Sequence, residues 1–324
     1  MRTIEPFAQD HIQDAAQLFI AEYSRQRRSR DCLPAKYADK DTVSGLLKAM
    51  LDKHPGVVAL SGSSLVGYLT GYTNIPDFKG ISPGVYTPEW AHGSAQDSGH
   101  VYQPMYEAIA RIWAGEGWFT HGLTFFSSDL ELRDLLYWNG FGLLVVDAVR
   151  AMNRGVPGDE VETDSGVVVR QAGRGDVDAL ARLDNELDTY LSGSPTFLYR
   201  SPGHEPDIAA EFLGADMTSV VAEVDGRVLA CIRGRDVHDN ACTIVRGPSL
   251  MGIDFAWTDP GVRGAGIGTQ ILAEILDWGR ERQKKGCAVD FESANALGTA
   301  FWLRHFEAIC YSAIRHVDPK VAGV

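Results

Sequence analysis

The spacing of apolar residues predicts alternating strands and helices along most of the chain. Residues 4–27 (IEPFAQDHIQDAAQLFIAEYSRQR) predict a short strand, a turn and a helix, with Asp10 as the expected N-cap. A second helix is predicted over residues 41–53. Residues 57–73 (VVALSGSSLVGYLTGYT) then hold two apolar runs around a Ser-Gly-Ser-Ser turn. Such a turn between apolar runs is typical of a β-hairpin.

The order of these elements repeats once in the second half of the chain. Residues 167–187 repeat the strand, turn and helix of the N-terminus, and Asp176 stands where Asp10 stood. Internal repetition of this kind indicates two copies of one domain. Besides this pair, three matched pairs of segments carry the repeat: 57–71 with 220–234, 86–96 with 258–268, and 135–141 with 300–306.

Residues 154–166 (RGVPGDEVETDSG) separate the two copies. They contain proline, glycine and acidic residues without periodicity, which is typical of an interdomain linker. We therefore predict one domain at residues 1–153 and a second at 167–324. The length of 324 residues agrees with two domains. The periodicity alone predicts an α/β or α+β class and goes no further.

The composition argues against several classes of protein and site. The formal net charge of −13 argues against nucleic acid as a partner, because binding it requires a basic face. No apolar run is long enough for a membrane span, and the N-terminus lacks the apolar region of a signal peptide. The five cysteines are odd in number and scattered, without a CxxC pair. The cysteines indicate reduced thiols in a cytoplasmic protein, with no disulfide frame and no zinc site. The lack of a membrane span predicts that the protein has no membrane partner.

The most informative stretch is residues 258–269 (TDPGVRGAGIGT), between a predicted strand and a predicted amphipathic helix. Gly264, Gly266 and Gly268 have no Cβ, so the backbone can adopt positive φ and turn several N–H groups toward one point. The helix that follows adds its own unpaired N–H groups and the positive end of its dipole. Arg263 places a cation beside them. Such a loop favours an anion, and a pyrophosphate suits it best.

The spacing of this loop differs from the GxGxxG of a Rossmann loop and from the GxxxxGK of a P-loop. Its RGxGxG order, with a proline three residues before the arginine, resembles the acyl-CoA signature of the GNAT superfamily of N-acetyltransferases, with Thr258 in place of the usual valine. The resemblance implies an α/β (α+β) protein of two tandem GNAT-type domains, each a mixed, mostly antiparallel sheet flanked by helices. It also implies acetyl-CoA as the acyl donor. The cofactor-binding residues expected on this basis are Ala256, Trp257, Thr258, Arg263, Gly264, Ala265, Gly266, Ile267, Gly268, Thr269 and Asn295.

The N-terminal copy has lost most of this loop. After Pro88 the chain reads Glu-Trp-Ala-His-Gly-Ser-Ala-Gln, so His92 stands where the arginine is expected and one of the three glycines remains. Its amides therefore cannot easily converge on phosphates. We expect this copy to bind no acyl-CoA and instead to support the fold or to wall the acceptor site. Tyr137 stands where many GNAT members carry a tyrosine, and in this copy we expect it to pack.

Asp254 is the most unusual residue of the strand before the glycine loop. Strict alternation places it with Ala256 and Thr258 on one face, opposite the aromatic residues of the strand. Some GNAT members place a general base at this position, and a carboxylate in an apolar strand is costly without a partner. Two interpretations stay open: a general base, or an ion pair with an arginine such as Arg233 or Arg235.

Four residues that follow the glycine loop in the sequence are candidates for a role in the chemistry. The resemblance implies that Asn295 hydrogen-bonds the pantetheine arm, and it can also cap the helix that follows. Glu292 could attract a cationic amine or act as a base, or be a solvated carboxylate. Trp302 stands where many members carry a tyrosine that protonates the departing thiolate, and an indole N–H is no acid near neutral pH. Tyr311 on the next strand, or solvent, would then supply that proton.

The activity that the resemblance implies is direct attack of a primary amine on acetyl-CoA in the C-terminal domain, with Asp254, Glu292 and Tyr311 as the catalytic candidates. Three alternatives stay open: an acyl-CoA-binding sensor without turnover, transfer of another acyl group, and transfer to an oxygen acceptor. We expect the acceptor to be a small-molecule amine or a peptide amine. The acidic surface weakly favours a cationic acceptor. The chain is expected to be a monomer or a homodimer.

Overall fold

The computed structural model describes residues 2–79, 82–95, 98–155, 166–199, 207–239 and 241–321. Contacts within the chain divide it into two compact units. Unit 1 comprises Met1–Asp147, Cys242–Ile244 and Ala308–Val324, and unit 2 comprises Ala148–Ala241 and Val245–Glu307. Most of the predicted linker, residues 156–165, lies outside the described residues.

The division into units differs from the predicted domains at the C-terminus. Strand β14 (Glu307–His316) runs antiparallel to β7 (Thr120–Phe126), from Cys310 opposite Phe126 to His316 opposite Thr120. Because this ladder joins most of β14 to β7, residues from 308 onward group with unit 1 and not with the copy that precedes them in the sequence. The apolar pattern of a strand does not name its partner, so the sequence could not predict this pairing.

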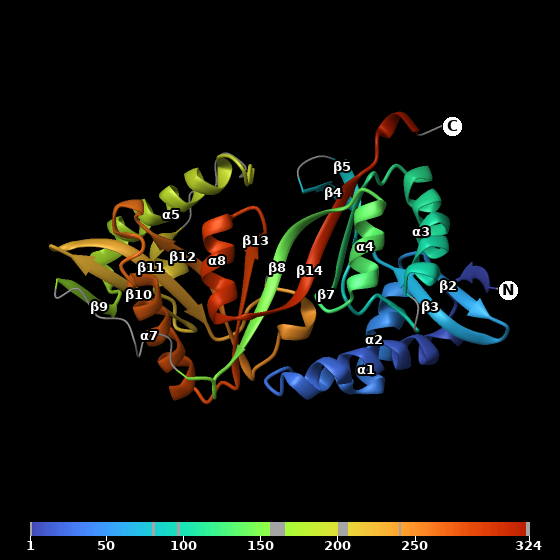
Figure 1. The fold of residues 1–324 in the computed structure, drawn as a ribbon, viewed down its shortest axis with the longest axis horizontal. Helices are drawn as coiled ribbons and strands as arrows, with labels where there is room; N and C mark the ends of the chain where they lie inside the picture. Colours follow the sequence, from blue (N-terminus) through green and yellow to red (C-terminus); the bar gives the residue numbers. More distant parts are fainter. Residues whose placement is uncertain are drawn as a thin grey trace. The chain divides into compact units, whose positions relative to one another are not determined.

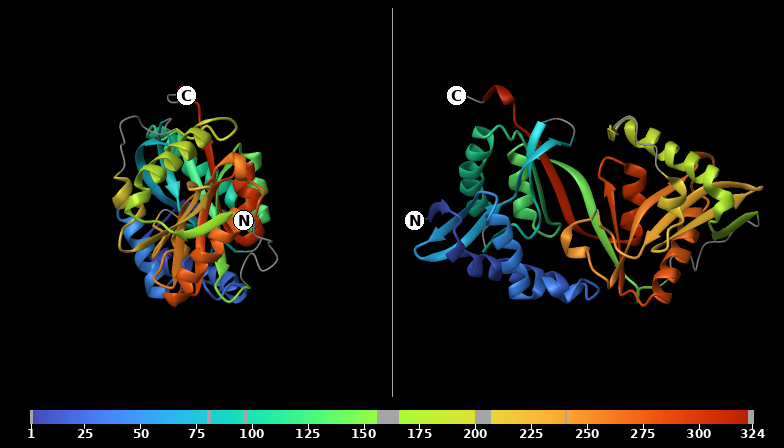
Figure 2. Two further views of the ribbon diagram at one scale, coloured as in Figure 1. Left: turned by 90° about the vertical axis from the view of Figure 1, so that its left-hand side faces the viewer. Right: turned by 180° about the vertical axis from the view of Figure 1, so that it is seen from behind.

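Unit 1 contains two groups of strands. Strands β1, β2, β3 and β6 form an antiparallel sheet in that order, and β4, β5, β7 and β14 are neighbours in a second sheet, where β5 and β7 are parallel. Figures 1 and 2 show α1 and α2 on one side of β2 and β3, with α3 on the other side. The bounds are β1 (Arg2–Pro6), α1 (Ile12–Ser29), α2 (Lys40–Leu51), β2 (Gly56–Ser61), β3 (Ser64–Thr70), β4 (Tyr72–Phe78), β5 (Ser82–Thr87), β6 (His92–Ser94), α3 (Ser98–Gly115), α4 (Leu130–Trp138) and β8 (Gly142–Ala151), which continues into unit 2.

The predicted N-cap of the first helix is wrong. A short 3-10 turn, Gln9–His11, precedes α1, and the N-cap is His11. The His11 Nδ1 atom accepts a hydrogen bond of 3.1 Å from the Ala8 N–H, which closes this turn. Asp10 therefore lies inside the turn, before the helix begins.

Unit 2 contains one mixed, mostly antiparallel sheet with flanking helices, as predicted. Its strands are ordered β9-β10-β11-β12-β13, and among them only β12 and β13 are parallel. The bounds are β9 (Val167–Gln171), α5 (Val177–Ser192), α6 (Ile208–Phe212), β10 (Met217–Val224), β11 (Arg227–Arg235), β12 (Leu250–Thr258), α7 (Ile267–Glu281), β13 (Gly286–Glu292) and α8 (Ala296–His305). Short 3-10 turns lie at Ala35–Ala38, Arg174–Asp176, Thr243–Val245, Pro260–Val262 and Pro319–Val321.

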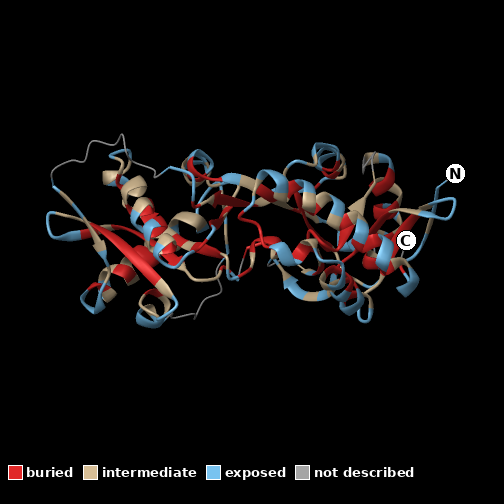
Figure 3. Ribbon diagram, turned by 90° about the horizontal axis from the view of Figure 1, so that it is seen from below, coloured by how far each residue is buried: buried red, intermediate tan, exposed pale blue. Residues whose placement is uncertain are grey.

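The two faces of the unit 2 sheet are covered by different helices (Figure 1). On the α5 face, Leu183 of α5 and Phe212 of α6 pack with Phe255 of β12. On the α7 face, Gly234 of β11 leaves room for Ile275 of α7, because a Cβ there would lie 3.3 Å from that side chain. Strands β10 to β13 are mostly buried and the edge strand β9 is not, while the helices have buried and exposed sides (Figure 3). The sheet is therefore a buried layer that fixes whatever its strand ends carry.

Candidate functional site

Strands β12 and β13 part before either of them ends. Their parallel pairing runs from Leu250–Gly286 to Ile253–Val289, and both strands lie wholly within the described residues. The remaining residues, 254–258 of β12 and 290–292 of β13, have no partner on the other strand. We call this region the β12–β13 split. Its backbone N–H and C=O groups are available to a ligand, since a strand edge without a neighbour presents unpaired groups.

A β-bulge at Asp254 accompanies the split. On β11, Arg233 lies opposite Phe255 and the next residue, Gly234, lies opposite Ile253, so Asp254 has no partner there. A bulge bends its strand and increases the local twist, which turns the end of β12 away from its neighbour. It also breaks the alternation of side chains, so the predicted placement of Asp254 on the face opposite Phe255 is wrong.

The contacts of Asp254 place it on the α5 face. Arg233 donates from Nε to the Asp254 Oδ1 atom at 2.7 Å, and Arg235 donates from its Nε to Oδ2. The Arg233 guanidinium also lies 4.5 Å from the centre of the Phe212 ring. Both carboxylate oxygens are thus engaged by guanidinium groups, and the side chain is only 10% exposed. The ion pair considered from the sequence is confirmed, and the role as general base stays a prediction.

The glycine loop has the backbone that its sequence predicts. Gly264 and Gly266 adopt φ of 84° and 79°, a left-handed conformation that side chains disfavour. Gly266 is the N-cap of α7. Gly268 serves another purpose, because a Cβ there would approach the Phe301 ring of α8 to 3.2 Å. Two glycines therefore shape the loop, and the third lets α7 pack closely against α8.

The N-terminus of α7 meets the requirements of an anion site. The first intrahelical bonds run from the Thr269 and Gln270 N–H groups to the Gly266 carbonyl. No side chain caps the helix within the described part of the chain. The N–H groups of Ile267 and Gly268, which precede these bonds in the helix, therefore remain for a ligand, and the helix dipole favours a negative one.

Arg263 is fixed between the loop and the end of β12. Its Nε donates to the Thr258 carbonyl at 2.8 Å. Its guanidinium lies 4.6 Å from the centre of the Trp257 ring and 5.3 Å from that of the Tyr190 ring. These contacts hold a permanent positive charge beside the glycine loop, where it adds to the field of the helix.

Tyr190 of α5 is a part of the site that the sequence analysis missed. Its ring lies 5.4 Å from the Trp257 ring, and its hydroxyl donates to the Asn295 Oδ1 atom at 3.3 Å. It thus links the two expected cofactor residues at the ends of the split. No sequence signal could have found it, since a tyrosine at the end of an amphipathic helix is ordinary.

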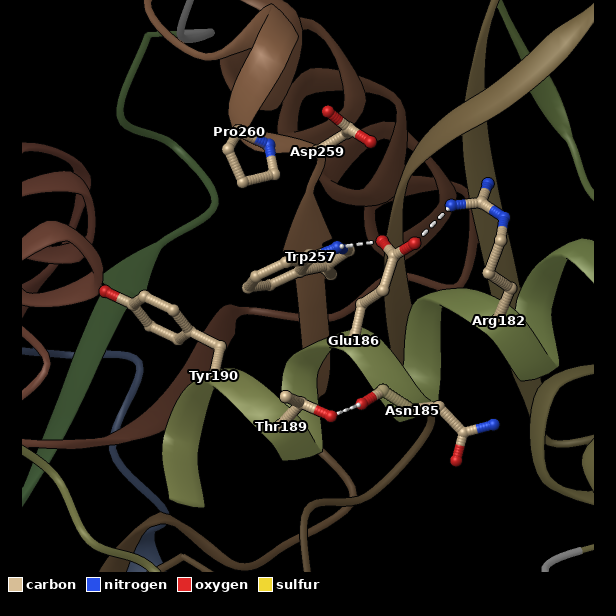
Figure 4. Close-up of a pocket in the computed structure, with 8 residues that line it drawn as sticks. All are labelled: Arg182, Asn185, Glu186, Thr189, Tyr190, Trp257, Asp259 and Pro260. Atoms are coloured by element: carbon tan, nitrogen blue, oxygen red, sulfur yellow. Dashed lines mark hydrogen bonds and ion pairs between the residues drawn. The ribbon is translucent and has the colours of Figure 1, made fainter. Parts of the chain in front are cut away.

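A groove of about 640 Å³ adjoins the end of β12 on the α5 side (Figure 4). Glu186 lies at its centre. Its carboxylate accepts a hydrogen bond of 2.8 Å from the Trp257 Nε1–H and one of 2.7 Å from the Arg182 guanidinium. The Trp257 side chain therefore belongs to the groove, while its backbone belongs to the split. The groove is lined by Arg182, Asn185, Glu186, Thr189, Tyr190, Trp257, Asp259 and Pro260.

The structure divides the predicted catalytic residues between the units. Asp254 and Glu292 lie in unit 2, in the strands that form the split. Tyr311 lies in unit 1, where it pairs with Phe125 of β7 and its ring lies 6.0 Å from the Phe125 ring. Trp302, at the position of the expected acid, is buried in α8 at 6% exposure. No hydroxyl donor stands at that position.

The corresponding region of unit 1 is built differently. Strand β5 stays paired with the parallel strand β7 up to its last residue, Thr87, which lies opposite Leu123. Where unit 2 has the glycine loop, unit 1 has strand β6, which pairs with β3. Tyr137 is 74% exposed, so the prediction that it packs is wrong. Unit 1 thus lacks both the split and the helix-capping glycines.

The described residues contain neither a metal-binding cluster nor a membrane-spanning helix. No cluster of three or more His, Cys, Asp or Glu side chains in them could hold a metal ion. No helix in the same part of the chain is long and apolar enough to cross a membrane.

Comparison with known proteins gives one family and one fold. Residues 184–306 match the model of the acetyltransferase (GNAT) family. No curated protein matches the sequence. A GCN5-related N-acetyltransferase from Sphaerobacter thermophilus is similar in structure, with a TM-score of 0.53 and 12% identity over 97% of this chain and 95% of that one. The glucosamine N-acetyltransferase region of a fungal multi-domain GH3 β-N-acetylglucosaminidase follows at a TM-score of 0.50 and 13% identity, over 97% of this chain and 38% of that one. A tandem GNAT protein from the clavulanic acid biosynthesis pathway has a TM-score of 0.48 and 12% identity, over 98% of each chain.

Proposed function

We propose that the chain is an N-acetyltransferase that uses acetyl-CoA and a primary amine, because residues 184–306 match the model of the GNAT acetyltransferase family. The proposal places both substrates in unit 2. The observation that carries it is the junction of the β12–β13 split with the N-terminus of α7. At this junction, Gly266 in the left-handed conformation begins the helix directly beyond the end of β12.

The residues of this junction fit coenzyme A in two respects. The first N–H groups of α7 and the Arg263 guanidinium suit its pyrophosphate, which carries negative charge. The free edges of the split suit its pantetheine arm, because the amide groups of that arm can hydrogen-bond an unpaired strand. The arm would then run between Thr258 and Asn295 toward the point where the strands part. The thioester would lie near the bulge, where backbone N–H groups can polarise its carbonyl.

The chemistry needs a neutral amine and a proton for the departing sulfur. Trp302 cannot supply that proton. We therefore propose that solvent protonates the thiolate, which is a good leaving group and needs less help than an alkoxide or an amine. Tyr311 stays an alternative donor of this proton. Glu292 stays a candidate for drawing a cationic amine toward the site.

Unit 1 is proposed to bind no acyl-CoA. Its strands leave no split, and β6 replaces the loop that would hold a pyrophosphate. Taken residue by residue, the repeat puts Ala91, and not His92 as expected, at the position of Arg263. The neighbouring His92 is 5% exposed and is hydrogen-bonded to the Tyr102 hydroxyl and to the Thr124 carbonyl. The cytoplasm stays the proposed compartment, since all five cysteines, each within the described chain, are buried free thiols.

The test measures binding and turnover on the full chain. Calorimetry with acetyl-CoA should show one site per chain, because unit 1 has none. Release of CoA thiol should then be followed with spermidine, glucosamine or a peptide with a free N-terminus as acceptor, and thiol should appear in an amine-dependent manner. Binding without thiol release for any amine would indicate a sensor. A stoichiometry of two, or no binding, would contradict the assignment of the site to unit 2 alone.

A further inference from the structure

A second carboxylate lies where β12 and β13 part. The last paired residues are Ile253 and Val289, so Asp290 is the first residue of β13 beyond the pairing and Asp254 is its counterpart on β12. Neighbouring strands lie about 4.8 Å apart, so a group at this position borders the start of the split. Any acyl group held at the bulge would therefore lie near Asp290.

Asp290 points to the α5 face of the sheet. Ile253 lies on the α7 face, and Val289 shares that face because paired residues of neighbouring strands point the same way. The next residue, Asp290, then points to the opposite face. His238 confirms this, since a Cβ built on Gly252 would lie 2.1 Å from the His238 Cβ on that same face.

His238 is packed against this carboxylate. Its Nε2 atom lies 2.7 Å from the Asp290 Oδ1 atom. The imidazole is 2% exposed, whereas the Asp290 side chain is 30% exposed. The contact has the distance of an ion pair without the angle of a hydrogen bond, so Nε2 has no hydrogen-bond partner among the described residues.

The segment that carries His238 is anchored in unit 2. The Lys284 Nζ atom donates to the carbonyls of Asp236 and Pro248, both at 2.9 Å. This buried ammonium joins the two ends of the segment between β11 and β12. His238 is thereby held at a fixed position behind Asp290, as a positioning group requires.

Asp290 is better placed to accept a proton than the other carboxylates of the split. Asp254 has both oxygens engaged by Arg233 and Arg235. Glu292 lies two residues further from the point where the strands part. Within the described residues, the imidazole is the one hydrogen-bonding or charged neighbour found for Asp290. Asp290 therefore combines a partly exposed carboxylate with a buried support.

We propose that Asp290 is the general base of the transfer and that His238 is a positioning residue which holds it. The inference rests on the proposed function, since it takes the acyl group to lie at the bulge. Asp290 accepts one proton from the ammonium form of the acceptor. The nitrogen lone pair then forms the C–N bond with the acyl carbon, the C–S bond breaks, and its electron pair stays on sulfur. The second nitrogen proton passes through solvent to the thiolate, and Asp290 returns its proton to solvent.

The charged groups around Asp290 allow it to stay ionised and to receive a cationic acceptor. The groups on the same face are the Arg233, Arg235, Asp254 and Glu211 network, Glu292 on the same strand, and His238. The two guanidinium groups neutralise Asp254, so the counterpart strand does not repel a second carboxylate. A protonated acceptor can then approach Asp290 without an opposing cation on β13.

The experiment compares Asp290→Asn with the wild type, using spermidine and hydroxylamine as acceptors. A spermidine ammonium must lose a proton before it attacks, whereas hydroxylamine is largely unprotonated at neutral pH. Asp290→Asn should lower kcat for spermidine about 100-fold or more, with a smaller loss for hydroxylamine. In the pH profile of kcat/KM for spermidine, the acidic limb of the wild type should disappear and be replaced by a rise at the pKa of the amine, and the affinity for acetyl-CoA by calorimetry should not change.

Two variants of His238 test whether this residue positions Asp290 without itself transferring a proton. His238→Gln keeps a donor near the Nε2 position and should keep most of the activity, whereas His238→Ala should lose it with unchanged acetyl-CoA affinity. The Nε2 resonance of His238, identified by its loss in His238→Gln, should move in the ¹⁵N spectrum of Asp290→Asn and stay in place in Glu292→Gln. This spectroscopic measurement does not depend on turnover. Glu274→Gln, an exposed change on α7, is the matched control.

The outcomes distinguish this inference from the proposed function. An active wild type with an unaltered kcat and pH profile in Asp290→Asn would overturn the inference alone. The same holds if Glu292→Gln, and not Asp290→Asn, removes the acidic limb. A wild type that binds acetyl-CoA but acylates neither acceptor would contradict the proposed function and the inference with it.

Discussion

The hydroxyl of Tyr190 donates a hydrogen bond of 3.3 Å to the side-chain oxygen of Asn295, which lies 105 residues later in the chain. The same oxygen accepts from the Gly298 N–H at 3.0 Å and so caps α8. Both bonds use Oδ1. The Nδ2 amide group is thus the part of Asn295 that remains to donate to a pantetheine carbonyl.

Because the oxygen of Asn295 caps the helix and its N–H group is left for the cofactor, Asn295→Asp and Asn295→Ala should have different effects. Asn295→Asp keeps an oxygen acceptor for Gly298, so the free energy of unfolding should stay within about 0.5 kcal/mol of the wild type. It loses the N–H donor, so acetyl-CoA should bind about tenfold more weakly, which corresponds to about 1.4 kcal/mol. Asn295→Ala removes the cap as well and should lower the free energy of unfolding by about 1 kcal/mol. Denaturant titration and calorimetry measure the two effects. Wild-type affinity in Asn295→Asp would remove this side chain from the cofactor site and leave its capping role intact.

Gly266 offers a test of the anion site that separates strain from ligand binding. Gly266 and Gly226 adopt φ of 79° and 75°, but Gly226 lies in the β10–β11 hairpin, away from the loop. Valine at either position should be destabilising by about 1–2 kcal/mol, because the left-handed region disfavours a β-branched side chain. Only Gly266→Val should abolish acetyl-CoA binding by calorimetry, since only there does the loop shape the N-terminus of α7. Equal loss of binding in both variants would show that strain alone is responsible.

The parts of the site that could be predicted from the sequence are those fixed by neighbours in the chain. The glycines at 264 and 266 require a loop with positive φ whatever the rest of the fold, and the strand before them and the helix after them follow from periodicity. The fold of two related copies followed from repetition of the same local patterns. Each of these signals is contained within a few tens of residues.

The parts that could not be predicted depend on contacts between distant segments. The bulge at Asp254 arises from the register of β11 against β12, which no single strand reveals. Tyr190 reaches Asn295, and His238 reaches Asp290, only because α5 and the segment after β11 cross the same strand ends. Pairing of β14 with β7 likewise depends on competition between strands of similar pattern. In each case the residue types are ordinary and their tertiary neighbours decide their role.

The ion pairs of Asp254 predict a large effect on stability. Asp254→Asn leaves Arg233 and Arg235 without the carboxylate that neutralises them in a nearly buried position. Breaking a buried pair by removing one partner costs about 3–5 kcal/mol, so the free energy of unfolding should fall by about 3 kcal/mol. Denaturant titration measures this loss, and Asp225→Asn, in the β10–β11 turn, is a control on the same unit.

The same variant also decides between the two interpretations of Asp254. If the residue supports the bulge and does no proton transfer, the folded fraction of Asp254→Asn should keep the acidic limb of the wild-type pH profile of kcat/KM. Disappearance of that limb, with stability unchanged, would instead make Asp254 the base. The rates should be measured at a temperature at which the variant remains folded, so that a lower rate does not reflect a smaller amount of folded protein.

His92 of unit 1, in the segment that corresponds to the glycine loop of unit 2, is hydrogen-bonded through both ring nitrogens. Its Nε2–H donates to the Thr124 carbonyl at 2.8 Å, and its Nδ1 accepts from the Tyr102 hydroxyl at 2.5 Å. Both ring nitrogens are satisfied only in the neutral form. Burial lowers the pKa of His92 from 6.5 to about 4, and the bond to Thr124 offsets only part of this.

This shift predicts how stability depends on pH. Because the pKa of His92 is lower in the folded chain than in the unfolded chain, the unfolded chain binds more protons between pH 6.5 and about 4. The contribution is fully present above pH 6.5 and is lost as the pH falls through that window, by about 3 kcal/mol from this residue. Replacing His92 by Gln, which can still donate to Thr124, should flatten the pH dependence of the free energy of unfolding of the chain by about that amount. His121 and His305, whose pKa values burial also lowers to about 4, keep the remaining slope. Denaturant titrations at several pH values, with the exposed His100→Gln as control, measure the difference, and an identical slope in His92→Gln and wild type would show that His92 is not buried in its neutral form.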